Sequence, residues 1–75
     1  SQRKKTGEAG EGRMIVRGKT VKLDDQVLMV KMKGECITFS VPTLSPEVLK
    51  AAKPGKNIDV EIPFSSIIGG ESCPE

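Results

Sequence analysis

Apolar side chains alternate with polar ones through most of this chain, and this period of two is the feature that most restricts its fold. Successive side chains of a β-strand point to opposite faces of a sheet, so the alternation predicts strands with one buried face. The predicted strands are 13–23, 27–33, 36–41 and 57–64. Their predicted inward-facing residues are Met14, Val16, Val21, Leu23, Leu28, Val30, Met32, Ile37, Phe39, Val41, Ile58, Val60, Ile62 and Phe64.

One segment between these strands has helical character. Pro42 ends the third strand, and residues 44–52 form the one helical stretch, in which the side chain of Ser45 caps the start of the helix. Pro46 suits the first helical position because its missing N–H is not needed there. A tight turn at 53–56 leads into the next strand, and residues 65–68 add a short closing strand.

This order of elements predicts a mainly β fold. Three strands, a short helix and then one or two strands fit a small five-stranded barrel of OB-like or SH3-like type, with the helix between strands three and four. An open sheet with the helix packed on one face is the alternative. Gly18 interrupts the first strand, which favours a bulge or bend at that position.

The two ends of the chain are expected to lie outside the folded domain. Residues 1–12 contain Arg3, Lys4 and Lys5 but almost no side chain that could be buried, which predicts a disordered basic tail. Residues 70–75 have the same polar character. The folded domain is therefore predicted to span residues 13–69.

Composition excludes most catalytic chemistry. A chain of 75 residues without histidine lacks both the usual acid–base group at neutral pH and the commonest metal ligand. We expect no enzyme activity, no metal and no cofactor. Cys36 and Cys73 have no zinc-type or redox-pair spacing, which favours two free thiols, although a disulfide that fixes the C-terminus is the alternative. No apolar run is long enough for a membrane span, so an intracellular, cytoplasmic location without membrane contact is expected.

Charge is distributed unevenly along the chain. Residues 13–33 carry a net charge of +4, whereas residues 57–75 carry −4. If the first two strands pair, their basic side chains share one outward face, which becomes favourable when an anionic partner covers it. The predicted partner-binding residues are Arg13, Arg17, Lys19, Lys22, Lys31 and Lys33.

An acidic protein is the partner that this face favours, which makes the chain a binding module of a larger protein or assembly. A solvated strand face explains the same residues without any partner. Nucleic acid is an alternative partner, but Phe39 and Phe64 are the two aromatic residues and both fall on the predicted buried face. The opposite charges of the two segments also permit self-association.

Residues 37–69 resemble the second half of the TOBE domain, the small barrel of molybdate-binding proteins and some transporter ATPases. The residues that carry the resemblance are Ser45, Leu49, Lys53-Pro54-Gly55-Lys56, the strand from Ile58 to Ile62, and Ser65-Ser66-Ile67-Ile68. Pro63-Phe64 departs from the Lys-Ala-like pair usual in that family. The resemblance implies a small barrel, with Ser65 and Ser66 as candidates for binding an oxyanion.

Overall fold

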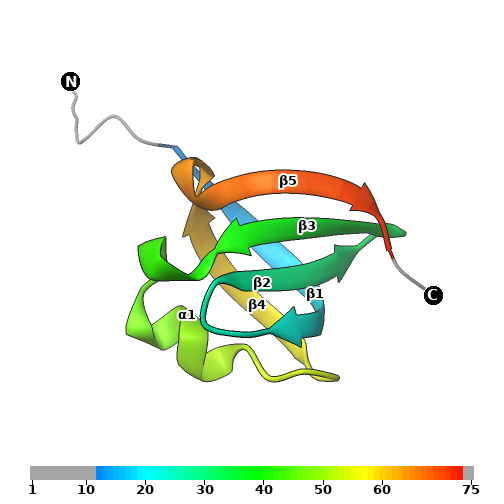
Figure 1. Cartoon of the computed structure of the whole chain (residues 1–75), viewed down its shortest axis with the longest axis horizontal. Coiled ribbons are helices and arrows are strands. Elements are labelled where there is room, and N and C mark those ends of the chain that lie inside the picture. The colour runs from blue at the N-terminus through cyan, green and yellow to red at the C-terminus, as the bar shows by residue number, and fades with distance from the viewer. Residues whose placement is uncertain (1–11, 74–75) are drawn as a thin grey trace.

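The computed structural model describes residues 12–73, and the predicted basic tail around Arg3, Lys4 and Lys5 lies outside them. Figure 1 shows the arrangement of the described elements. In chain order they are β1 (Arg13–Leu23), β2 (Val27–Met32), β3 (Glu35–Ser40), the 3-10 turn η1 (Val41–Thr43), α1 (Pro46–Ala51), β4 (Asn57–Pro63), the 3-10 turn η2 (Phe64–Ser66) and β5 (Ile67–Ser72).

The five strands form one antiparallel sheet in the order β4-β1-β2-β3-β5. The prediction of a mainly β fold with one short helix between the third and fourth strands is confirmed. The prediction of a closed barrel is wrong, because β4 and β5 are the two edges of the sheet and do not pair with each other within residues 12–73. The open-sheet alternative describes the architecture.

The segment between β3 and β4 accounts for the open sheet. It packs on β4 and buries Leu44, Val48 and Ala52 in the same core as the strands. The chain therefore covers this side of the core with η1 and α1, where a closed barrel would need another strand pairing. The predicted helix start is confirmed: the Ser45 hydroxyl accepts a hydrogen bond from the Val48 N–H at 3.3 Å, and Pro46 is the first helical residue.

Strand β1 is shared between two pairings. Residues 13–19 pair with β4, and residues 19–23 pair with β2, so that Lys19 has a neighbour on each side. The bulge lies between Thr20 and Lys22 and not at the predicted Gly18. It shifts the alternation by one residue, and Val21, predicted to face inward, is 39% exposed.

Gly18 has a different role. A Cβ atom at this position would overlap the carbonyl oxygen of Lys31 and lie 3.0 Å from Cγ1 of Val30. The glycine therefore allows β1 to cross closely over β2.

The core combines residues from four strands with Val48 of α1 and with Leu44 and Ala52, which flank this helix. Its buried members are Val16, Leu28, Val30, Phe39, Leu44, Val48, Ala52, Ile58 and Ile62. Phe64, predicted to face inward, is 53% exposed. The alternation of β4 ends at Pro63, and the 3-10 turn that follows rotates Phe64 away from the core.

The structure joins Cys36 to Cys73 by a disulfide, with 4.8 Å between their Cα atoms. The expectation of two free thiols is therefore wrong. The sequence could not show this pairing, because it depends on β5 lying beside β3 up to Ser72, beyond the predicted domain end at residue 69. A stable disulfide is typical of oxidising compartments and does not fit the expected cytoplasmic location.

Candidate interaction surface

One row of residues crosses the outer face of the sheet and includes two of the predicted contact lysines. Directly paired positions on neighbouring strands point to the same side, so the pairing of all five strands defines the row. From β4 to β5 it consists of Asn57, Lys19, Lys31, Cys36 and Glu71.

Lys19 and Lys31 occupy directly opposite positions of β1 and β2, and both are exposed. Directly opposed Cβ atoms lie about 4.5–5.5 Å apart, and like charges in this arrangement destabilise a sheet. Neither ammonium group forms a salt bridge within residues 12–73. The pair is therefore a local concentration of positive charge that folding alone does not compensate.

The two arginines of the predicted contact face have acidic neighbours. Arg17 lies opposite Asp59, and its Nε is 3.1 Å from the carboxylate of Asp59. Both side chains are largely exposed, so this ion pair contributes at most about 1 kcal/mol. Arg13 lies near Glu61, with which it lines a surface hollow. The pairing of β1 with β4 thus places part of the acidic segment beside the basic one.

Lys22 and Lys33 lie apart from the Lys19–Lys31 pair. Lys22 follows the β1 bulge, and its Nζ is 3.7 Å from the carboxylate of Asp24. The N–H groups of Val27 and Gln26 donate hydrogen bonds to the same carboxylate at 2.8 Å each, and they hold the pKa of Asp24 below its ordinary value. Lys33 has a φ of 52° in the turn between β2 and β3.

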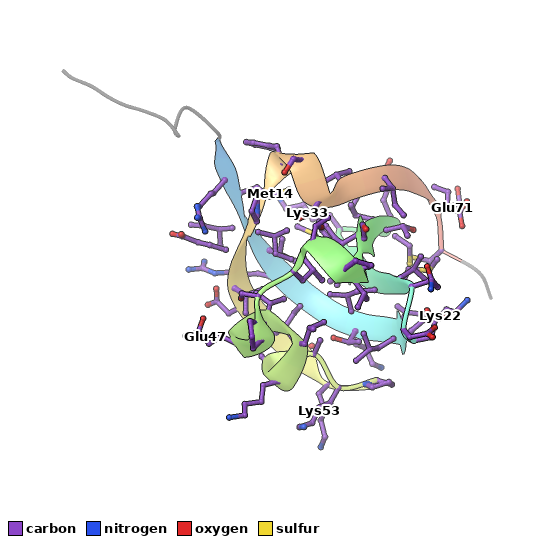
Figure 2. The ribbon with its side chains drawn as sticks, turned by 60° about the vertical axis from the view of Figure 1, so that its left-hand side comes forward. Met14, Lys22, Lys33, Glu47, Lys53 and Glu71 are labelled. Atoms are coloured by element: carbon purple, nitrogen blue, oxygen red, sulfur yellow. A yellow bond between two sulfur atoms is a disulfide. The ribbon has the colours of Figure 1, made fainter. Side chains whose placement is uncertain are left out.

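Two lysines outside the predicted set belong to the 53–56 turn, whose backbone is held beside β1. Lys56 precedes Asn57, which is paired with Lys19, and the Thr20 N–H donates to the Lys56 carbonyl oxygen at 2.9 Å. The Gly55 N–H donates in return to the Thr20 carbonyl oxygen at 2.8 Å, so the 53–56 turn is fixed against β1. Lys53 belongs to the same turn and extends away from the ribbon in Figure 2. We call Lys19, Lys31, Lys53 and Lys56 the lysine surface.

The two serines suggested for oxyanion binding have different environments. Ser66 is fully buried, and its hydroxyl is hydrogen-bonded to the Thr43 hydroxyl at 2.7 Å. The Thr43 hydroxyl donates its one proton to the carbonyl oxygen of Ser40 at 2.7 Å and therefore accepts from Ser66. Ser65 is exposed. The hydroxyl of Ser66 thus connects η2 to η1, and only Ser65 is accessible to an anion in this conformation.

Two adjoining surface hollows, of about 270 and 480 Å³, lie between α1 and β4. Both are lined by Arg13, Ser45, Val48 and Glu61. The hollows combine charged groups of both signs with apolar surface, and their charged residues are exposed. Nothing in this arrangement selects one class of ligand.

Neither aromatic residue lies where it could stack on a base bound at the lysine surface. Phe39 is fully buried in the core. Phe64 is exposed, but its N–H donates a hydrogen bond to the Gly12 carbonyl oxygen. Gly12 directly precedes β1, seven positions from Lys19. At about 3.3 Å per residue, the seven residues between positions 12 and 19 span about 23 Å. An aromatic stacking platform beside the lysines is therefore absent from the described part of the chain.

Among residues 12–73, no group of three or more cysteine, aspartate or glutamate residues is arranged to hold a metal ion. No helix in this part is long and apolar enough to cross a membrane. Comparison with known proteins finds no matching family model, no matching curated protein and no matching solved structure. The resemblance to the TOBE domain therefore stays a prediction.

Proposed function

We propose that this chain is a non-catalytic interaction module that binds an acidic protein surface through the lysine surface. The observation that carries the proposal is the Lys19–Lys31 pair, two exposed ammonium groups at directly opposed positions without an acidic partner in the described residues. A carboxylate-rich partner would convert this unfavourable juxtaposition into a favourable contact.

The fixed 53–56 turn supports the proposal. Its two hydrogen bonds to Thr20 keep the backbone of Lys56 beside β1 in the absence of a partner. A turn whose backbone is already fixed loses less conformational entropy on binding than a mobile loop. Charge complementarity mainly raises the rate of association and depends strongly on salt.

An acidic protein is favoured over nucleic acid because of the distance between the lysine surface and Phe64. Single-stranded nucleic acids gain about 1–3 kcal/mol per base from stacking on aromatic side chains. Phosphate contacts alone would give weak, non-specific binding.

The test compares two charge reversals that change the net charge equally. We expect Lys31→Glu to weaken binding of a glutamate-rich peptide at least tenfold at low salt. Lys50→Glu, on the exposed side of α1, should change it less than twofold. Lys31→Glu should also stabilise the fold by about 0.2–1 kcal/mol, because it creates an opposite-charge pair with Lys19.

Titration of the unmodified chain with peptide, single-stranded and duplex oligonucleotides, and molybdate separates the alternatives. If Lys31→Glu and Lys50→Glu weaken peptide binding equally, binding depends only on the net charge of the chain, which would contradict a defined binding surface. Oligonucleotide or molybdate binding without peptide binding would replace the proposal.

A further inference from the structure

The Cys36–Cys73 disulfide closes the C-terminal end of β5, which is an edge strand. We propose that this disulfide is a redox-controlled clasp, and that opening it frees the edge of β3 for an extended strand of a partner. The binding of this strand does not use the lysine surface and does not require an acidic partner.

Strand β5 makes few side-chain contacts with the rest of the fold except at its two ends. Its one neighbour in the sheet is β3, and five of its six residues are exposed. Ile67 is half-buried and packs against the core, whereas Ile68 lies at a bulge and is 59% exposed. Before the strand, the Ser66 hydroxyl is hydrogen-bonded to the Thr43 hydroxyl. After the strand, the disulfide links Cys73 covalently to β3. Without the disulfide, the C-terminal half of β5 has only its backbone pairing.

The edge of β3 that pairs with β5 is suited to a replacement strand. β5 pairs along β3 with Phe39 and Ile37, which face the core, and with Cys36, which faces the outer side of the sheet. Departure of β5 would leave the outward N–H and C=O groups of β3 unpaired. Such an edge binds an extended segment through main-chain hydrogen bonds, with pockets for alternate side chains supplying specificity.

The chemistry of opening requires a dithiol reductant. Cys36 is fully buried and Cys73 is partly exposed, so a reductant thiolate reaches the sulfur of Cys73. The S–S bond breaks, the sulfur of Cys36 leaves with the electron pair and takes up a proton, and a mixed disulfide forms at Cys73. The second thiol of the reductant then displaces Cys73 and closes a disulfide within the reductant. Lys31, directly opposite Cys36 on the same face, provides positive charge beside the leaving sulfur.

The contacts of β5 define the strand that would replace it. The position opposite Phe39 holds Ile67, and the position opposite Ile37 holds Gly70. A Cβ atom at Gly70 would lie 3.2 Å from Cδ1 of Ile37, whereas one at Gly69 would meet no atom within 4 Å. The fitting partner is therefore an extended segment with an apolar residue and, three positions later, a residue with a very small side chain.

Hydrogen exchange of the full chain, oxidised and reduced with dithiothreitol, tests the clasp. The β5 amides that are hydrogen-bonded to β3 should exchange at least tenfold faster after reduction. In the reduced chain they should also exchange at least tenfold faster than amides in the β1–β4 pairing, which open only with the whole fold. An unchanged rate in β5, or equal rates of the two sets of amides in the reduced chain, would overturn the clasp, since β5 would then open only together with the whole fold.

Disulfide tethering tests the acceptor edge. The full chain with Cys73→Ser is equilibrated, in a thiol buffer, with a peptide of residues 66–73 whose cysteine carries an activated disulfide. The natural peptide and its G69V form should couple to Cys36 in similar yield, and the G70V form at least fivefold less. Equal yields from the two valine peptides would show that Cys36 reacts as an ordinary thiol, and the edge would not be an acceptor.

Discussion

Reduction of the Cys36–Cys73 disulfide should cost this fold a large part of its stability. The bond joins residues separated by 37 positions and encloses η1, α1, β4, η2 and β5. For a loop of this length, the chain-entropy treatment gives about 3.8 kcal/mol at 25 °C from the restriction of the unfolded chain. A 75-residue chain typically has a total free energy of unfolding of roughly 4–11 kcal/mol. The disulfide would then supply a third or more of the total.

Urea unfolding of the same protein, oxidised and in the presence of a phosphine reductant, measures this contribution. The reduced wild-type chain is the appropriate comparison, because truncation of the fully buried Cys36 would add a cavity. The double variant Cys36→Ala with Cys73→Ala serves as the control, and its midpoint should not respond to the phosphine. A difference below about 1 kcal/mol between oxidised and reduced chains would refute the loop argument.

Three further predictions concern single residues. Thr20→Val should stabilise the fold by about 1 kcal/mol in urea unfolding, because the Thr20 hydroxyl is buried without a hydrogen-bond partner; a loss of stability would indicate an unrecognised partner. Gly18→Ala should lower the free energy of unfolding by about 1–3 kcal/mol, whereas Gly69→Ala, which meets open space, should change it by less than about 0.5 kcal/mol. Because the folded state lowers the pKa of Asp24 from 3.8, the stability from this carboxylate is present above that value and is lost as the pH falls through the folded pKa. Asp24→Asn should therefore flatten the acid end of the curve of stability against pH, and an unchanged curve would contradict the role of these hydrogen bonds.

The elements of this fold follow from local signals in the sequence. The alternation of Val30 and Met32 with Lys31 and Lys33 identifies β2, and the Ser45-Pro46 pair defines the start of α1. These features depend on residues only a few positions apart, so they can be predicted from a short stretch of sequence. Closure of the sheet depends instead on whether two distant edges meet. The apolar pattern of Leu44, Val48 and Ala52 does not show that this segment would take the place of a strand pairing.

Alternation fails as a guide where the strand period changes. The bulge between Thr20 and Lys22 shifts the phase of β1 and exposes Val21, and the end of β4 at Pro63 exposes Phe64. Both residues are apolar, and each lies two positions from a residue that packs in or against the core, Leu23 for Val21 and Ile62 for Phe64, so composition gives no warning. A bulge is set by pairing with the neighbouring strand, and this pairing is not a property of the strand's own sequence.

The charged surface also depends on strand pairings that the sequence does not show, and these pairings bear on function. Counted along the chain, the basic first half and the acidic last segment look like two opposite faces. The pairing of β1 with β4 instead places Asp59 against Arg17, 42 positions away, and leaves Lys19 facing Lys31. The same strand thus carries a compensated charge at one position and an uncompensated one two residues later. Since only the uncompensated pair gains from an anionic partner, the contact surface should be smaller than the six predicted residues and should extend toward Lys53 and Lys56.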